Sequence, residues 1–210
     1  MSPLPEQMAN RWELRRPLML PPGQGLLYWH VLLGEEPEAV AIVEEAQARL
    51  GGLSGLDLVP LSHIHLTVLI AGYSHETTST QAAEMAQAAG HQLADVGPIS
   101  VTLGRVLYHP EAVALEAQPA ERLTPLLEAA KTATRTVTGQ EGRLAHDLWT
   151  PHVTVAYSSA DGPAAPIINA LGKRLPDRDV TIRSLSLVAQ DGPETTWAWQ
   201  PLTEARLDSL

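Results

Sequence analysis

The sequence predicts an α+β fold that is bilobal, with two similar halves around a central cleft. Apolar runs of strand length alternate with segments whose apolar residues recur at helical spacing. The order helix, strand, helix, strand, strand also occurs twice along the chain. The first strand of each series contains His-apolar-Thr-Val, beginning at His65 and at His152, which are 87 positions apart. Such a repeat indicates duplicated helix–strand–helix–hairpin units related by a pseudo-twofold axis.

The first half begins after a segment of different composition. Residues 1–24 are rich in proline and polar residues and predict an N-terminal arm. The apolar and aromatic run GLLYWHVLLG predicts a strand at 25–34, which Gly34 ends. Apolar spacing and the Gly51-Gly52 stop predict the helix that opens the first series. The series comprises a helix at 36–50, a strand at 58–72, a helix at 79–97 and a hairpin of strands at 99–108 and 112–118.

The second series repeats this order. Its first helix ends at Gly139, and its last two strands flank the turn-forming sequence Asp191-Gly192-Pro193. We therefore expect one bilobal domain at 25–210, with repeats at about 36–118 and 120–203. The elements of the second series are helices at 120–139 and 162–175 and strands at 149–158, 179–190 and 195–202.

Composition limits the class of protein. Of 210 residues, 44% are hydrophobic and 18% are charged, which is ordinary for a globular protein and unlike a disordered chain. The absence of cysteine excludes disulfides, thiolate metal sites and a cysteine nucleophile. No apolar stretch approaches membrane-spanning length, and the N-terminus lacks the apolar segment of a secretory signal. We expect a cytoplasmic monomer with no membrane association.

The charge balance bears on the binding partner. Lys and Arg number 14 against 24 Asp and Glu, which gives a net charge of −10. Proteins that bind long nucleic acids neutralise many phosphates with clustered basic residues. We therefore expect no extended nucleic-acid binding, and a phosphate-bearing substrate should be small or held only locally. The same charge also suits an acidic surface that serves solubility alone.

The two repeated strands predict where chemistry occurs. Side chains alternate across a strand, so the histidine and threonine of each motif share one face. On the opposite face, Ile70 follows the aliphatic residues of the first strand and Tyr157 those of the second. The pseudo-twofold axis would bring both polar faces into one cleft. The residues predicted to meet there are His65, Thr67, His152 and Thr154.

This set of side chains suits phosphoester chemistry. Imidazole has an ordinary pKa of about 6.5, so it accepts and donates protons near neutral pH. Attack on a phosphodiester needs a base for the nucleophile and an acid for the leaving oxygen. Threonine hydroxyls can donate hydrogen bonds to the non-bridging oxygens. A single His-x-Thr is more often structural, but two equivalent copies favour function.

The duplicated His-x-Thr pattern, together with WTPHVTVAYS and RSLSLVAQ before a Trp-rich strand, resembles the two-histidine (2H) phosphoesterase superfamily. Its bacterial 2'-5' RNA ligase-like branch is the most similar, and the resemblance covers residues 25–203. It implies a 2H phosphoesterase fold and cofactor-free, metal-independent action on 2',3'-cyclic phosphates or 2'-5' linkages. The implied acid–base pair is His65 and His152, with Thr67 and Thr154 binding phosphate. Either histidine could be the base.

Further residues are candidates for substrate binding. Tyr28 and His30 share the face of their strand that could reach the cleft, whereas Trp29 faces the core. Arg143 is the arginine nearest to the second motif in the sequence, and Arg183 lies in the closing strand. Each could equally be a surface charge. The other aromatic and basic candidates are Trp149 and Arg105.

The preferred interpretation is a phosphodiesterase that opens a cyclic phosphate on a small nucleotide or an RNA end. One alternative is a binding module of the same fold without turnover. Another is a metal hydrolase that adds His63 to the two motif histidines, since His-x-His is a known ligand spacing. RNA 2'-5' ligation is the same chemistry run in reverse.

Overall fold

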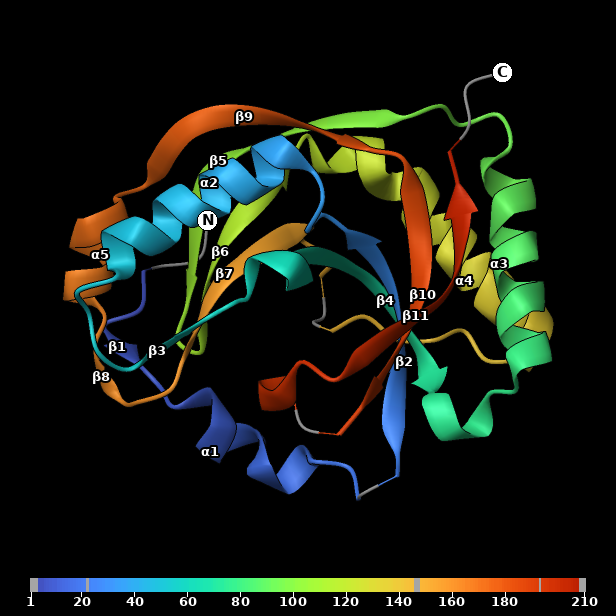
Figure 1. Ribbon diagram of the computed structural model, residues 1–210, viewed down its shortest axis with the longest axis horizontal. Coiled ribbons are helices and arrows are strands. Elements are labelled where there is room, and N and C mark those ends of the chain that lie inside the picture. The colour runs from blue at the N-terminus through green and yellow to red at the C-terminus, as the bar shows by residue number, and fades with distance from the viewer. Residues whose placement is uncertain (1–3, 22, 146–147, 193, 208–210) are drawn as a thin grey trace.

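The computed structural model describes residues 4–21, 23–145, 148–192 and 194–207 (Figure 1). Residues 1–3 and 22 of the predicted arm, 208–210 of the predicted domain and Pro193 of the predicted turn lie outside the described residues. No helix in the described ranges is long and apolar enough to cross a membrane. The α-helices are α1 (Arg11–Arg15), α2 (Pro37–Leu50), α3 (Ser79–Leu93), α4 (Thr124–Thr138) and α5 (Ala165–Leu171).

Strands alternate with these helices along the chain. The strands are β1 (Gln7–Met8), β2 (Gly25–Leu32), β3 (Leu56–Leu58), β4 (His65–Tyr73), β5 (Ile99–His109), β6 (Ala112–Gln118), β7 (His152–Ser158), β8 (Gly162–Pro163), β9 (Arg174–Ile182), β10 (Ser184–Asp191) and β11 (Trp199–Arg206). Short 3₁₀ helices are η1 (Arg16–Leu18), η2 (Leu61–His63), η3 (Ser74–Glu76), η4 (Ala120–Leu123) and η5 (Glu194–Thr196).

The main sheet consists of two groups of antiparallel strands that meet at β4 and β7. Its order is β11-β10-β2-β4-β7-β6-β5-β9, and β3 also pairs with β7. The two groups are joined into one sheet through the single pair Leu66 and Val153. The strands of the two sequence series are interleaved, because β10 and β11 lie beside β2 while β5 and β6 lie beside β7.

Helices cover one face of each group of strands. α3 and α4 pack together and contact β11 and β4, whereas α2 packs on β9 and α5. Figure 1 shows these pairs on opposite sides of the molecule. The two motif strands therefore have helices behind them, and their other face is left for the cleft.

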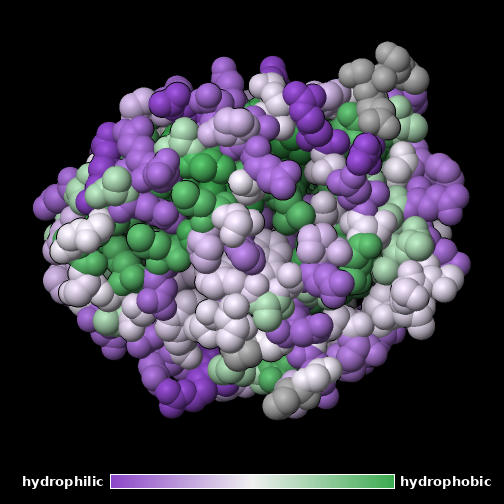
Figure 2. Space-filling view, viewed as in Figure 1, coloured by the Kyte–Doolittle hydropathy of each residue, from purple (hydrophilic) through white to green (hydrophobic). Residues whose placement is uncertain are grey.

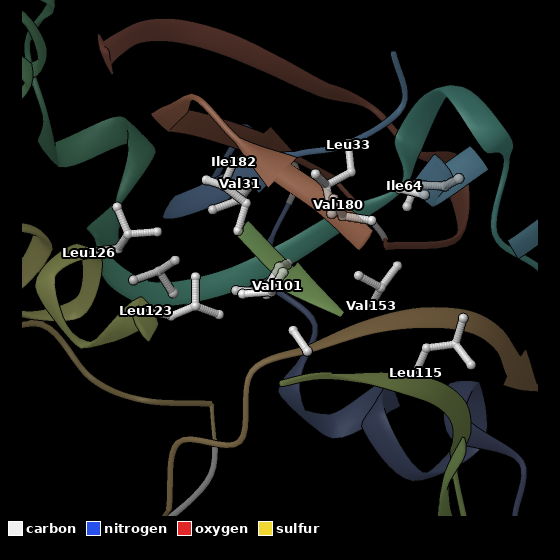
Figure 3. Close-up of a cluster of buried hydrophobic side chains, with 14 of the residues drawn as sticks. Val31, Leu33, Ile64, Val101, Leu115, Leu123, Leu126, Val153, Val180 and Ile182 are labelled. Atoms are coloured by element: carbon white, nitrogen blue, oxygen red, sulfur yellow. The ribbon is translucent and has the colours of Figure 1, made fainter. Parts of the chain in front are cut away.

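Aliphatic side chains fill the space between sheet and helices. Figure 3 shows part of this core, where Val31, Val101 and Val153 come from different strands. Trp29 is fully buried, as its place on the strand predicts, and its indole N–H donates to the hydroxyl of Thr134 in α4 at 3.0 Å. This hydrogen bond satisfies a polar group that would otherwise be buried without a partner.

Several predicted boundaries differ from the structure. The segment 58–72 is not one strand, because Pro60, which cannot donate a ladder hydrogen bond, stands between β3 and β4. The segment 179–190 is divided at Arg183 between the end of β9 and β10. The predicted helix 162–175 shortens to α5, between β8 and β9. Gly139 ends α4 as predicted, with a left-handed φ of 75°.

The N-terminal arm has regular structure. Its β1 pairs with β8, and the side chain of Asn10 caps α1 by accepting from the backbone N–H of Trp12. Arg11, Trp12 and Arg15 of α1 all line the main cleft. The arm is therefore part of the cleft wall as well as an added edge.

Candidate active site

The four residues of the two motifs line one cleft of about 830 Å³. They come together because β4 and β7 are antiparallel neighbours joined at Leu66 and Val153, whose side chains are buried in the core. The flanking positions face the opposite side. Counting outward from this pair sets His65 opposite Thr154, and Thr67 opposite His152. The cleft is thus supplied with an imidazole and a hydroxyl from each strand.

Both histidines are held in the same way. The Nδ1 atom of His65 lies 2.8 Å from the carbonyl oxygen of His63, and that of His152 lies 2.7 Å from the carbonyl oxygen of Thr150. A carbonyl can only accept, so Nδ1 carries the proton and donates it in both cases. Nε2 is then the nitrogen that gains or loses a proton during chemistry. Two backbone carbonyls thus fix matching tautomers.

A β-bulge follows each motif threonine. The register between β2 and β4 skips Val68, and that between β6 and β7 skips Val155. Each extra residue reverses the alternation of the positions after it. The prediction that Ile70 and Tyr157 lie on the packing face was therefore wrong, since both line the cleft.

His65 lies in a crowded aromatic environment. Its ring centroid is 4.7 Å from that of Trp199, edge to face, and 4.4 Å from that of His30. Burial lowers the pKa of His65 to about 4, and the neighbouring His152 contributes in the same direction. His65 is therefore neutral at pH 7, with Nε2 ready to accept a proton.

Tyr28 and His30 lie where predicted, with limited access. Both line the cleft, and their rings stack at 4.9 Å, but His30 is only 3% exposed and Tyr28 only 8%. Burial, followed by the neighbouring His65, holds the pKa of His30 well below its ordinary value. His30 therefore packs against the ring of His65, and Tyr28 packs against His30.

The predicted arginines separate into two groups. Arg143 lines the cleft, and its backbone is fixed to Ile70 by two hydrogen bonds of 2.9 Å. Arg183 lies exposed between β9 and β10, outside the residues that line the cleft, so the structure does not bring it to the site. Arg105 does line the cleft, but it is paired with Glu116 at 2.7 Å.

Two other candidates have different surroundings. His63 lies beside Trp197 and Trp199, and its Nδ1 is 2.9 Å from the hydroxyl of Ser62. Among the described residues, no three His, Cys, Asp or Glu side chains are grouped so as to hold a metal ion. Trp149 does not line the cleft. Its indole N–H donates to the carbonyl of Thr67 at 3.1 Å, which links the segment before β7 to β4.

Part of the cleft wall was not predicted from the sequence. The missed residues are Arg11, Trp12, Arg15, Ile70, Tyr157, Trp197 and Trp199. The sequence WAW at 197–199 could have indicated the tryptophans of this wall, because two tryptophans so close to a turn are seldom both buried in a core. The arm residues gave no such signal, since their position depends on the pairing of β1 with β8.

The chain matches a known protein family and several solved structures. The sequence model of the 2'-5' RNA ligase superfamily matches residues 35–194. A comparison with curated protein sequences finds no match. TT0787 of Thermus thermophilus is similar in structure, with a TM-score of 0.63 and 22% identity over 87% of this chain and 97% of that one.

Two further solved structures are similar. E. coli LigT complexed with 3'-AMP has a TM-score of 0.64 and 16% identity over 89% of this chain and 99% of that one. The MHV ns2 PDE domain has a TM-score of 0.51 and 13% identity over 75% and 99%. These structures confirm the predicted mixed helix and sheet fold, and the superfamily match covers most of the chain. The chain belongs to the 2'-5' RNA ligase superfamily, the 2H phosphoesterases.

Proposed function

We propose that this protein is a metal-independent phosphodiesterase that opens a 2',3'-cyclic phosphate with His65 and His152 as acid and base. The observation that carries the proposal is the matched pair of imidazoles. Each donates Nδ1–H to a carbonyl two residues earlier, which leaves Nε2 for proton transfer, and both line the same cleft. Two imidazoles that exchange protons through Nε2 are what an in-line displacement at phosphorus needs.

The low pKa of His65 supports a division of roles. Burial keeps His65 neutral at pH 7, with a pKa of about 4, so it suits the base that takes a proton from the attacking water. The water oxygen then bonds to phosphorus, and the bond from phosphorus to one ribose oxygen breaks. His152 gives its Nε2 proton to that departing oxygen. The product is a nucleoside 2'- or 3'-monophosphate in which the other of these two hydroxyls is free.

Other cleft residues support the charged transition state. Thr67 and Thr154 can donate hydroxyl hydrogen bonds to the non-bridging phosphate oxygens. Arg143 lines the same cleft, and its positive charge suits a bound phosphate. In this scheme the two imidazoles make both proton transfers, so no metal-bound water is needed.

A structural neighbour supports a small nucleotide substrate. E. coli LigT has been crystallised with 3'-AMP, and a nucleoside monophosphate of that kind is what opening of a 2',3'-cyclic phosphate yields. We extend this to the present chain as part of the proposal. We expect 2',3'-cyclic mononucleotides to be substrates and a single phosphate to occupy the space between the two histidines.

Product analysis by HPLC and phosphorus NMR tests the proposal. The four 2',3'-cyclic nucleotides would be incubated with wild type, His65→Ala and His152→Ala, with and without EDTA. His91→Ala is the matched control, because His91 is an exposed histidine on α3 away from the cleft. We expect wild type and the control to give monophosphate in EDTA and each active-site variant to be about 10²- to 10⁴-fold slower.

Two outcomes would contradict the proposal. Full activity in either His65→Ala or His152→Ala would remove that residue from the mechanism. Loss of turnover on chelation, restored by a divalent metal, would replace it with a metal mechanism. Adding an RNA with a 5'-hydroxyl to the same reaction tests ligation, which would appear as a longer product.

A further inference from the structure

The N-terminal arm is attached to the β7 side of the cleft. The backbone N–H of Ala9 donates to the carbonyl of Pro110 at 2.8 Å, beside the turn between β5 and β6. The backbone N–H of Asn10 donates to Asp161 at 2.7 Å, and the indole N–H of Trp12 donates to Asp57 at 2.7 Å. These contacts fix α1 as a wall of the cleft on the side that carries His152.

The opposite wall is the loop between β10 and β11. The loop contains Glu194 and Trp197, and Trp199 begins β11; all three line the cleft. Trp199 packs on His65 at 4.7 Å. Trp197 has a φ of 51°, in the left-handed region that non-glycine residues rarely adopt, which indicates that its surroundings hold the loop in place.

Arg11 connects the two walls. Its Nε and Nη2 both donate to Oε2 of Glu194, at 3.0 and 2.5 Å, and its Nη1 donates to Glu111 at 3.2 Å. The guanidinium carbon lies 4.3 Å from the ring centroid of Tyr157, and Trp197 stacks on that same ring at 6.1 Å. The side chain of Arg11 is only 10% exposed, so water screens this contact poorly. We call Arg11, Glu111 and Glu194 the clasp.

The clasp also neutralises positive charge in the cleft. Glu111 pairs with both Arg11 and Arg15, and Arg105 is paired with Glu116. These arginines line the cleft but are neutralised by carboxylates. Exposed Leu18, Met19 and Leu148 also line it. Figure 2 shows one face of the molecule, on which hydrophobic and pale residues lie among many hydrophilic ones.

An RNA end and a mononucleotide differ in what they demand from such a cleft. Each further nucleotide adds one phosphate, whose binding depends on available cations. A longer strand also needs an open path from the reactive phosphate to the protein surface. The clasp joins the two walls beside His65 and Tyr157, and the arginines it holds are already paired.

We propose that the clasp selects substrates of one nucleotide with a single phosphate, over RNA strands that end in the same cyclic phosphate. This inference rests on the function proposed above and narrows its substrate class. Opening the clasp should release the loop from α1 and admit the longer substrate.

Glu194→Gln tests the inference, because it keeps the shape of the side chain and removes its charge. The measurement is kcat/KM for a 2',3'-cyclic mononucleotide and for a pentanucleotide that ends in the same cyclic phosphate. Wild type should prefer the mononucleotide, and Glu194→Gln should raise the ratio of pentanucleotide to mononucleotide about tenfold, as expected for loss of a charged hydrogen bond. Glu45→Gln is the matched control, because it removes an exposed ion pair with Arg49 on α2.

A second measurement does not depend on activity. The chain has no cysteine, so spin labels can be placed on Leu14→Cys in α1 and Ala198→Cys in the loop, both of which are exposed. Glu194→Gln should broaden the distribution of distances between the labels, and Glu45→Gln should leave it as in wild type.

Each result decides a different part of the inference. A broader distribution with a higher ratio supports it. An unchanged distribution refutes the clasp, and a broader distribution with an unchanged ratio refutes its role in selection. A wild type that prefers the pentanucleotide also overturns the inference. A wild type that turns over neither substrate refutes the proposed function, and the distance measurement then still decides whether the clasp exists.

Discussion

Trp199 is expected to control the acidity of His65. The edge-to-face contact at 4.7 Å shields the imidazole from water, and burial is the main reason why its pKa is lowered to about 4. Replacing Trp199 with Ala would let water reach the part of the ring that Trp199 covers, while His30 stays in contact with it at 4.4 Å. The charged form should become easier to reach, so the pKa of His65 should rise.

The size of the effect follows from the ordinary value of the group. Full exposure would return the pKa to 6.5, the usual value for histidine, and half-exposure should move it part of that way. A rise of about one unit in the pKa corresponds to about 1.4 kcal/mol in the free energy difference between the charged and neutral forms. At pH 4.5, about three quarters of His65 would be neutral in wild type, against about one quarter in Trp199→Ala. The base would then be about threefold less available at that pH.

Two measurements check this prediction. NMR titration of the imidazole resonances gives the pKa of His65 directly, and the acid limb of kcat/KM against pH reports the same group in the free enzyme. Both should move upward together in Trp199→Ala. Trp12→Ala is the matched control, since Trp12 is another cleft tryptophan and packs on Tyr157 instead of His65.

The prediction fails if the pKa of His65 in wild type lies near 6.5. It also fails if Trp199→Ala leaves a low pKa unchanged, because burial by Trp199 would then not be its cause. If the NMR value moves but the acid limb of kcat/KM stays in place, His65 is not the base.

Three further predictions concern the motif, the pH response and the core. Thr67→Val should lower kcat about 10- to 100-fold without changing the fold, since a hydrogen bond to the phosphate is lost; steady-state kinetics and circular dichroism check it. The pKa values of His65 and His30 are lowered in the folded protein, so below pH 6.5 the unfolded chain binds protons at these residues more readily than the folded protein does. Their contribution to the free energy of unfolding is complete above pH 6.5 and is lost as the pH falls toward the folded pKa values. For His65 the loss is about 2 kcal/mol at pH 5, which urea denaturation at pH 7.5 and pH 5 would detect. Thr134→Val should cost about 1–3 kcal/mol by leaving the indole N–H of Trp29 unpaired, with kcat retained, and an unchanged urea midpoint would contradict it.

Local sequence patterns were sufficient for much of the fold. Alternation placed Trp29 in the core and Tyr28 and His30 on the cleft face, because the period of two is a property of any extended strand. Glycine stops also predicted the end of α4 at Gly139. The repeated His-x-Thr motif pointed to one shared site, and its four residues do line one cleft.

Other features depended on contacts between distant segments. The bulges at Val68 and Val155 arise where the register with a neighbouring strand shifts, and no single strand sequence encodes that shift. Ile70 and Tyr157 therefore changed faces. Arg183 was a candidate because of its place in the closing strand, but it lies between β9 and β10, outside the residues that line the cleft.

The sequence alone was enough to predict the class of fold, the family and the four motif residues that line the cleft, because each of these follows from short repeated patterns. The tertiary structure decided which other residues surround them. Arg11 is 183 positions from Glu194 in the chain, and the docking of the arm, through β1 on β8 and the hydrogen bonds beside it, brings them into contact. The low pKa of His65 is likewise decided by packing, since burial by Trp199 and its neighbours depends on how strands far apart in sequence meet.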